Sequence, residues 1–322
     1  MKYLVTGGTG FIGSALVRRL LKEGNQVRVL DNGLRGMLGR LEDILSKIEV
    51  IEGDIRELRV VQEATKGIDT VCHLAYLNGT EFFYTKPELV LEIGVKGIVN
   101  VIDACLKEGV RELVVASSSE VYQTPPKIPT DETVPLSIPD PLNPRYSYAG
   151  GKIISELMAI NYGRKYFDKV LIFRPHNVYG PDMGWEHVIP QFVSRLKKLA
   201  AETNGVINFP IQGTGDETRA FIYIDDFIGA LLTVIEKGEH LNVYHIGTSQ
   251  EISMKKLAEM TAHCFDREIR IIPGQLMQGS TPRRCPDVSK LTKLGFTPKI
   301  DLAAGLARTV VWYRENNPTE RS

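Results

Sequence analysis

Residues 1–13, MKYLVTGGTGFIG, decide the fold of this chain. Lys2–Val5 is apolar enough to predict a buried strand, and the amphipathic stretch after the glycines predicts a helix. Gly7, Gly10 and Gly13 recur every third residue between the two elements. Side chains at these positions would block a tight turn, the approach of a pyrophosphate and the packing of helix on strand. The turn therefore predicts a dinucleotide held at a helix N-terminus, where the helix dipole favours an anion.

The first half of the chain alternates short apolar runs with longer amphipathic ones. Strands are expected at Lys2–Val5, Gln26–Asp31, Glu49–Glu52, Thr70–His73, Glu112–Ala116, Lys169–Arg174 and Val243–Ile246. Helices are expected at Ile12–Glu23, Val60–Thr65, Pro87–Glu108 and Tyr146–Tyr166. Strands that alternate with helices form right-handed βαβ units around a parallel sheet covered on both faces. The pattern thus predicts an α/β, Rossmann-type doubly wound fold.

After about residue 178 the alternation loosens, which predicts a smaller C-terminal substrate lobe interleaved with the sheet. The dinucleotide-binding domain is expected at 1-177, with 216-247 returning to it, and the lobe at 178-215 and 248-322. Gln123–Pro144, rich in Pro, Asp and Ser, predicts a long surface loop. Long loops in compact domains are usually functional, which makes this one a candidate to border a site.

Acidic residues after the second and third strands predict contacts with the adenosine half of the dinucleotide. Asp31 ends the second strand roughly 20 residues beyond the glycines, where a carboxylate binds a ribose 2′-hydroxyl. Its charge disfavours a 2′-phosphate and so favours NAD over NADP, although Arg35 and Arg40 nearby leave NADP open. Asp54 follows the third strand and would face the adenine edge, with a helix N-cap as the equal alternative.

Three side chains between residues 118 and 152 predict hydride-transfer chemistry. Tyr148 and Lys152 are four residues apart and share one helix face. A free phenol has a pKa of about 10, and a nearby ammonium together with the positive nicotinamide of NAD favours its phenolate. Such a tyrosine can take a proton from a sugar hydroxyl while hydride leaves the carbon. Ser118 would hydrogen-bond the same oxygen, and Glu120 is either a second acid or base or a solvent-facing carboxylate.

Composition and charge exclude several classes of function. The 322 residues carry 39 Lys plus Arg and 39 Asp plus Glu, and this balance gives no sign of a nucleic-acid or membrane partner. No apolar run is long enough to span a bilayer, and the first residues predict a core strand rather than a signal peptide. The four cysteines and six histidines lack ligand spacing, so no metal is expected. A cytoplasmic protein with buried free thiols is the resulting expectation.

In combination these motifs resemble those of the extended short-chain dehydrogenase/reductases, specifically the nucleotide-sugar epimerase, dehydratase and decarboxylase branch. The resemblance covers nearly the whole chain and implies NAD as cofactor, a nucleotide-diphosphate sugar as substrate and a homodimer formed through Pro87–Glu108 and Tyr146–Tyr166. It implies catalytic roles for Ser118, Tyr148, Lys152 and Glu120. It implies cofactor contacts from Gly7, Gly10, Phe11, Ile12, Gly13, Asp31, Asn32, Asp54, Ile55, Leu74, Ala75, Tyr148 and Lys152. It implies substrate contacts from Ser118, Asn177, Arg219 and Arg284, and Tyr76 is expected to contact the substrate by shaping the sugar pocket.

The second half of the chain carries the expected substrate contacts. Asn177 lies in a segment similar to the family's R-x-x-N-x-Y-G-P stretch. Arg219 and Arg284 match basic positions of the family, where guanidiniums hold a diphosphate by charge-assisted bonds. Asn78 and Trp185 would shape the sugar pocket, with a packed core Trp as the alternative for Trp185.

The resemblance implies oxidation of a sugar carbon, usually C4, to a ketone, and simple 4-epimerisation is the preferred outcome. A 4,6-dehydratase typically has Asp-Glu after its catalytic Thr, whereas this chain has Ser119-Glu120, which argues against dehydration. Ser118–Tyr122 is closer to the UDP-glucuronate decarboxylases, and His176-Asn177 is similar to a 3,5-epimerase of GDP-mannose. A non-catalytic NAD-binding scaffold is the second class of function. Gly94, where the family usually has an Asn that supports the site, weakly favours it.

Overall fold

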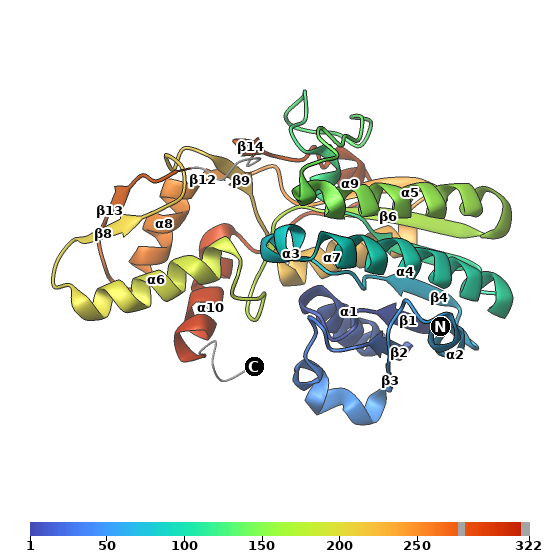
Figure 1. Ribbon diagram of the computed structural model, residues 1–322. Helices are drawn as coiled ribbons and strands as arrows, with labels where there is room; N and C mark the ends of the chain where they lie inside the picture. The colour runs from blue at the N-terminus through green and yellow to red at the C-terminus, as the bar shows by residue number, and fades with distance from the viewer. Residues whose placement is uncertain (276–280, 317–322) are drawn as a thin grey trace.

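The computed structural model describes residues 1–275 and 281–316. Within these ranges a parallel seven-stranded sheet has the order β11-β6-β5-β4-β1-β2-β3 (Figure 1). Its strands are β1 (Lys2–Thr6), β2 (Gln26–Asp31), β3 (Glu49–Glu52), β4 (Thr70–His73), β5 (Glu112–Ala116), β6 (Lys169–Pro175) and β11 (Asn242–Ile246). The predicted Rossmann-type doubly wound fold is confirmed, and each predicted strand agrees with the structure to within one residue at its ends.

Helices cover both faces of this sheet (Figure 1). One face carries α1 (Phe11–Lys22) and α7 (Ile224–Lys237), and the other carries α2 (Leu58–Thr65), α4 (Pro87–Glu108) and α5 (Ser147–Tyr166). Short helical segments in the connections are η1 (Leu38–Lys47), α3 (Thr80–Thr85), η2 (Ser119–Tyr122), η3 (Pro144–Tyr146) and α9 (Ser289–Lys293). The strand order reverses at β1, which pairs with β2 on one side and with β4 on the other. Ligands bind open α/β sheets at this reversal, beside the carboxyl ends of the strands.

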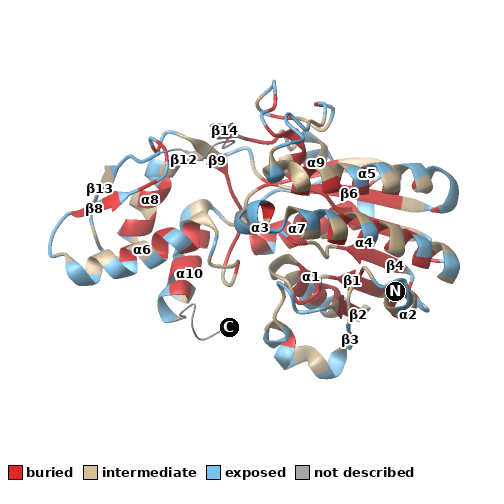
Figure 2. Ribbon diagram, viewed as in Figure 1, coloured by how far each residue is buried: buried red, intermediate tan, exposed pale blue. Residues whose placement is uncertain are grey.

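Two hydrophobic cores lie on opposite faces of the sheet, because successive strand residues point to opposite sides. Val5 and Phe173 belong to the core under α1 and α7, and their neighbours Leu4 and Ile172 belong to the core under α2, α4 and α5. Figure 2 shows the central strands as buried. Strands buried on both faces read as continuous apolar runs, which explains why the sequence pattern located them. Burial at about 25 cal/mol per Å² of apolar surface is the main force that holds these layers together.

The smaller lobe lies beside the carboxyl ends of the strands (Figure 1). It contains helices α6 (Val188–Glu202), α8 (Met254–His263) and α10 (Leu302–Glu315), and the strand pair β8 (Ile207–Pro210) and β13 (Ile269–Ile272). A further small sheet has the order β12 (Glu251–Ser253), β9 (Thr218–Ala220) and β14 (Arg283–Arg284), and β7 (Val178–Tyr179) pairs with β10 (Ile222–Tyr223). Of the lobe segment 248-322, residues 276–280 and 317–322 lie outside the described residues.

The segment predicted to return to the sheet, 216-247, has two locations in the structure. Its end, β11, completes the large sheet next to β6, and α7 packs against that sheet. Its beginning, β9, pairs instead with β12 and β14 of the small sheet. The chain therefore crosses between the two parts more than once, and the exact domain boundaries remain a prediction.

Candidate active site

The glycine turn lies at the carboxyl end of β1. Gly7 has a φ of 72°, in the left-handed region, and a Cβ there would lie 2.7 Å from the backbone nitrogen of Ala75 after β4. A Cβ on Gly13 would overlap the carbonyl oxygen of Gly7. Helix α1 begins with Phe11 and Ile12, and no side chain caps its N-terminus. The turn is thus a backbone cradle at a helix N-terminus, which suits an anionic pyrophosphate.

Asp31 ends β2 beside this cradle, as predicted for a ribose contact. Its Oδ2 accepts a hydrogen bond from the backbone nitrogen of Thr9 at 2.9 Å, and its Oδ1 accepts one from Gly33 at 3.0 Å. These two bonds fix the carboxylate next to the turn. The geometry fits the predicted contact with a ribose hydroxyl, because carboxylate oxygens have further lone pairs to accept from it.

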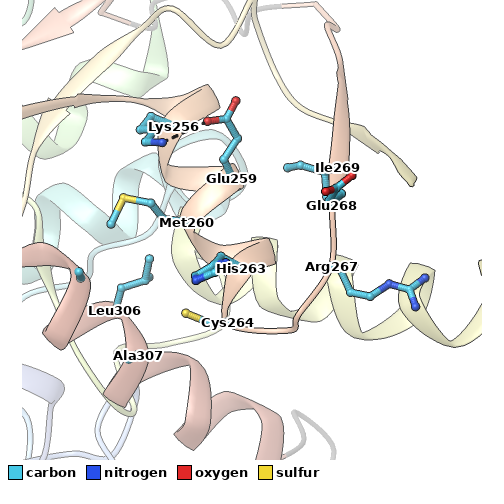
Figure 3. A pocket seen from close by; sticks show the side chains of 11 residues that line it. Lys256, Glu259, Met260, His263, Cys264, Arg267, Glu268, Ile269, Leu306 and Ala307 are labelled. Carbon is cyan, nitrogen blue, oxygen red and sulfur yellow. Dashed lines mark ion pairs between the residues drawn. The ribbon is translucent and has the colours of Figure 1, made fainter. Parts of the chain in front are cut away.

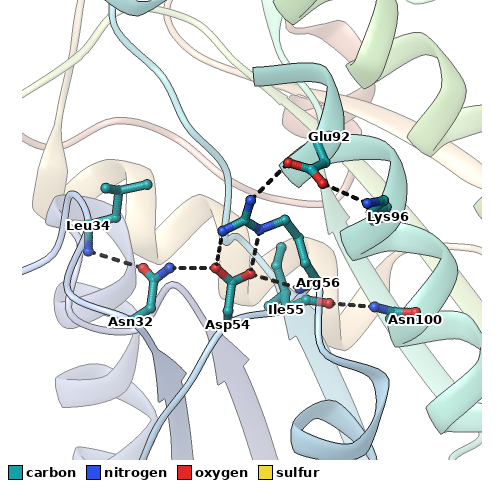
Figure 4. Close-up of polar contacts among 8 residues, drawn as sticks. All are labelled: Asn32, Leu34, Asp54, Ile55, Arg56, Glu92, Lys96 and Asn100. Atoms are coloured by element: carbon teal, nitrogen blue, oxygen red, sulfur yellow. Dashed lines mark hydrogen bonds and ion pairs between the residues drawn. The ribbon is translucent and has the colours of Figure 1, made fainter. Parts of the chain in front are cut away.

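Asp54 and Asn32 lie together at the ends of β3 and β2 (Figure 4). Asn32 Nδ2 donates to Asp54 Oδ2 at 3.1 Å, and Arg56 donates to the same carboxylate from its guanidinium and, at 2.8 Å, from its backbone nitrogen. Arg56 also pairs with Glu92 of α4. These bonds hold the pKa of Asp54 below its usual value. The N-cap alternative for Asp54 is wrong, since no side chain caps α2.

The backbone after β4 forms the opposite wall of the same region. Thr6 Oγ1 accepts hydrogen bonds from the backbone nitrogens of Leu74 and Ala75, each at 3.2 Å. A pocket at this place is lined by Gly7, Gly10, Asp31, Asn32, Asp54, Ile55, Leu74, Ala75 and Tyr76, together with neighbouring residues. The structure therefore brings most of the predicted cofactor contacts together around one cavity, and they fit a dinucleotide: a cradle for the pyrophosphate and a carboxylate for the ribose.

Tyr148, Lys152 and Ser118 meet at the carboxyl end of β5. Tyr148 and Lys152 lie on one face of α5, and both side chains are buried. Lys152 Nζ donates to the carbonyl oxygen of Ala116 at 2.6 Å. The side chains of Ser118 and Tyr148 are hydrogen-bonded to each other. The structure thus assembles a hydroxyl, a phenol and an ammonium beside the cofactor pocket, the set that the sequence predicted.

Burial controls the charge of this group, because it shifts the pKa values of Tyr148 and Lys152 away from their charged forms. Burial raises the pKa of Tyr148 well above its usual value, and the hydrogen bond with Ser118 only partly opposes it. Burial also lowers the pKa of Lys152 to about 7, although the Glu156 carboxylate acts in the opposite direction. At neutral pH the protein's own groups therefore leave Tyr148 protonated. The predicted phenolate then depends on the positive charge of a bound nicotinamide.

Glu120 is ion-paired rather than free in solvent, although 23% of its side chain remains exposed. Its Oε1 accepts from Arg284 Nη1 at 2.7 Å, and its Oε2 lies 3.9 Å from Arg145 Nη2. Burial alone would raise the pKa of Glu120, but Arg284, Arg145 and Arg219 hold it below its usual value. Burial and the nearby Arg284 lower the pKa of Arg219 to about 10. Three guanidiniums thus act on the Glu120 carboxylate, and Glu217 is a second carboxylate near Arg219, so three positive charges stand against two negative ones.

The remaining predicted substrate residues differ in their surroundings. Asn177 has a φ of 39°, and its Nδ2 donates to the carbonyl oxygen of Ala220 at 2.9 Å, so its amide also ties β7 to β9. Trp185 packs against Tyr313 of α10 with ring centroids 4.7 Å apart, which supports the packing alternative rather than a sugar contact. Asn78 is exposed.

Two residues of the site escaped the sequence reasoning. Phe83 of α3 stacks on Tyr148, with ring centroids 4.9 Å apart and planes at 24°. Arg145 approaches Glu120 from η3. For Arg145 a signal existed, since it is a basic residue three positions before Tyr148. For Phe83 the sequence offers only an aromatic cluster in a loop near the predicted pocket.

A larger cavity, of about 610 Å³, lies in the lobe between α8, β13 and α10 (Figure 3). Met260, His263, Cys264 and Leu306 are among the residues that line it. All four cysteines of the chain are free, and Cys264 is partly exposed whereas the other three are buried. We assign the active site to the sheet edge rather than to this cavity, because the hydroxyl, phenol and ammonium meet there. In the described residues, no helix is both long and apolar enough to cross a membrane.

Comparison with known proteins identifies the family. A profile of the NAD dependent epimerase/dehydratase family matches residues 3–247. The chain is 31% identical over 322 residues to a putative UDP-glucose 4-epimerase of Methanocaldococcus jannaschii, covering 98% of this chain and 99% of that protein. It is 30% identical to UDP-glucuronic acid decarboxylase 1 of Arabidopsis thaliana over 98% of this chain and 70% of that protein.

Solved structures also match this chain over nearly its whole length. The crystal structure of a dTDP-glucose 4,6-dehydratase from Streptomyces venezuelae, with NAD and TYD bound, superposes with a TM-score of 0.86. The two chains are 31% identical, and 98% of each is covered. Relatives of similar identity thus include epimerases, decarboxylases and dehydratases, and the cofactor of this family is NAD. The chain belongs to the NAD dependent epimerase/dehydratase family, within the extended short-chain dehydrogenase/reductases.

Proposed function

We propose that the protein is an NAD-dependent nucleotide-sugar epimerase that inverts a sugar at C4 through a transient 4-keto sugar. The observation that carries this proposal is the meeting of Ser118, Tyr148 and Lys152 at the sheet edge that holds the glycine turn. An alcohol can be oxidised there, because a proton acceptor and the cofactor pocket lie side by side.

The residues of the chain have distinct roles in this reaction. Ser118 orients the sugar hydroxyl next to the phenol. Tyr148 takes the hydroxyl proton as the carbon loses hydride, and it returns the proton when the other face of the ketone is reduced. Lys152, held by the Ala116 carbonyl, binds the nicotinamide ribose and stabilises the phenolate. Bound NAD supplies the chemistry of accepting and returning the hydride.

The arginine cluster supplies the substrate contacts in this proposal. Arg219 and Arg284 lie on neighbouring strands β9 and β14, which pair in parallel, so that both guanidiniums reach the same region. A diphosphate carries the negative charge that complements them, and planar guanidiniums bind phosphate oxygens in pairs. The sugar would then lie between the diphosphate and Tyr148.

Decarboxylation of a sugar acid is the second candidate, and the surroundings of Glu120 favour it. Arg284, Arg145 and Arg219 exceed the charge of that one carboxylate. Such a cluster can bind anionic groups of a substrate, and a sugar carboxylate would be one of them besides the diphosphate. Curated relatives of about 30% identity include several UDP-glucuronic acid decarboxylases, whose names state a substrate of this kind.

The test is incubation of the purified protein with UDP-, GDP-, dTDP- and CDP-sugars, both neutral and uronic, with products read by mass and NMR. A product of unchanged mass that is epimeric at C4 and free of deuterium after reaction in D2O supports the proposal, because the C4 hydride never exchanges with solvent. Loss of carbon dioxide assigns the decarboxylase, and loss of water assigns a dehydratase. Bound NAD without turnover of any donor would overturn the enzyme assignment and leave the scaffold.

A further inference from the structure

Tyr76 occupies an unusual position between the catalytic ammonium and the catalytic phenol. It follows β4, and its ring lies under Lys152, with Nζ 4.0 Å from the ring centroid. The same ring meets Tyr148 edge to face, with centroids 5.0 Å apart and planes at 81°. A cation over an aromatic face is stabilised by the ring's quadrupole, more strongly where water is excluded.

The hydroxyl end of Tyr76 reaches into a slot between α4 and α5. The slot exists because both helices have glycine there: a Cβ on Gly94 of α4 or on Gly151 of α5 would overlap Tyr76 Oη. Oη is buried, and within the described residues no hydrogen-bond partner lies in range of it. A buried hydroxyl without a partner costs free energy, so its own bonding does not explain this position. The contact between the ring and the Lys152 ammonium explains this position instead.

We propose that Tyr76 is a positioning residue, whose ring holds the Lys152 ammonium in place and which is itself fixed by the slot that Gly94 and Gly151 open. Its significance for catalysis rests on the proposed function, whereas its effect on Lys152 does not. The sequence analysis expects Tyr76 to contact the substrate in the sugar pocket. In this proposal it acts on the reaction through Lys152 instead.

The surroundings of Lys152 make the ring's contribution measurable. Apart from the ring, the ammonium has the Ala116 carbonyl as hydrogen-bond partner. The titratable groups around it are Glu156 and Tyr148 on α5 and His73 on β4. Burial, with Lys152 as a second cause, lowers the pKa of His73 to about 3, so this imidazole is neutral. Loss of the aromatic ring therefore removes a stabilising contact that no neighbouring charge replaces.

The first test compares Tyr76→Phe with Tyr76→Leu. Phe keeps the ring and removes the unpartnered hydroxyl, whereas Leu removes the ring. The pKa of Lys152 is measured by NMR of lysine-labelled protein, with the signal assigned from Lys152→Met. We expect Tyr76→Phe to retain the wild-type pKa and Tyr76→Leu to lower it by about one unit. An unchanged or raised pKa in Tyr76→Leu overturns the proposal.

The second test uses the slot itself, with binding of NAD+ and the melting temperature as readouts. Gly151→Ala would displace Tyr76, because the new Cβ would overlap Tyr76 Oη. Adding Tyr76→Phe to the same chain removes this overlap, since the nearest remaining ring atom, Cζ, lies 3.3 Å from the new Cβ. We expect the single variant to bind NAD+ at least about tenfold more weakly and the double variant to recover. Gly150→Ala is the matched control, because its Cβ would meet only Ile138, at 3.8 Å.

The two tests distinguish a failure of this proposal from a failure of the proposed function. Neither test needs a sugar substrate, so a protein without turnover can still confirm or overturn the role of Tyr76. Should Gly151→Ala fail to fold, recovery of folding and NAD+ binding in the double variant supports the proposal. A double variant as impaired as the single one shows that the hydroxyl does not occupy the slot, and the proposal is then wrong.

Discussion

Tyr148 is closely packed, although the proposed reaction requires it to exchange a proton. Phe83 stacks on its ring and Tyr76 meets the edge, so the phenol has a fixed direction toward Ser118. Such packing excludes water and raises the pKa of the phenol. In the proposed reaction, the positive charge of bound NAD would reverse that shift, which would couple proton transfer to cofactor binding.

Tyr148→Phe is expected to lower turnover of the natural nucleotide sugar by at least about 100-fold, because the proton acceptor is lost while the ring packing remains. NAD binding should change little. Initial rates and NAD titration measure both effects. Tyr146→Phe, two residues earlier, is the control and should keep wild-type rates. Full activity in Tyr148→Phe would remove the tyrosine from the mechanism.

Lys152 makes stability depend on pH. Its pKa is about 7 in the folded protein against an ordinary value of about 10.5, so between these values the unfolded chain binds one more proton. The contribution of this group to stability is therefore least favourable below about pH 7 and improves as pH rises. We expect the unfolding free energy of wild type to rise relative to Lys152→Met by up to about 1.4 kcal/mol per pH unit between about pH 8 and 9.5. Urea titrations at several pH values measure this slope, and equal pH dependence of the two proteins would contradict it.

At the scale of elements, α5 connects the site to the sheet through a buried ion pair. Glu156 accepts from Arg174 of β6 at 2.8 and 2.6 Å, and it also hydrogen-bonds Ser117 after β5. The pair is almost completely buried. Because α5 carries both Tyr148 and Lys152, this pair sets where the phenol and the ammonium stand relative to the strands.

Glu156→Gln should lower the unfolding free energy by about 3 kcal/mol or more, because it leaves the buried Arg174 without a counter-charge. Chemical denaturation measures the loss. The matched control is Asp168→Asn, which breaks the exposed pair with Arg111 and should leave stability nearly unchanged. Similar losses of unfolding free energy in the two variants would show that burial does not determine how much these ion pairs contribute to stability.

Features encoded by neighbouring residues could be predicted from the sequence, whereas contacts between distant parts of the chain could not. Strands such as β5 are apolar on both faces, with Val114 in one core and Leu113 in the other, so their runs of residues are visible locally. The glycine turn and the spacing of Tyr148 and Lys152 are local as well. The surroundings of Glu120 are not, because its partner Arg284 lies 164 residues away in the chain. The slot that receives Tyr76 likewise depends on how α4 packs on α5, which no local pattern encodes.

At the scale of the whole molecule, we expect a homodimer through α4 and α5. These helices pack against each other and present large apolar side chains to solvent, including Leu91, Ile154 and Leu157, the last with 54% of its surface exposed. Exposed apolar side chains gathered on one face are typical of association surfaces.

Leu157→Asp is expected to convert the dimer to a monomer, because it would bury a charge at the contact. Light scattering coupled to size exclusion measures the mass in solution. Leu142→Asp, at a loop position with 90% of its surface exposed, is the control and should remain dimeric. A wild-type protein that elutes as a monomer would refute the expected association.

The place of β11 at the edge of the large sheet has a consequence for how the protein is made on the ribosome. The chain leaves the sheet after β6, builds α6 and β8 of the lobe and only then supplies β11, at residues 242–246. Until that strand emerges, the nascent chain exposes the backbone N–H and C=O groups along the edge of β6, and open edges of this kind invite pairing with other chains. We therefore expect the chain to be prone to aggregation during synthesis until residue 246 has emerged.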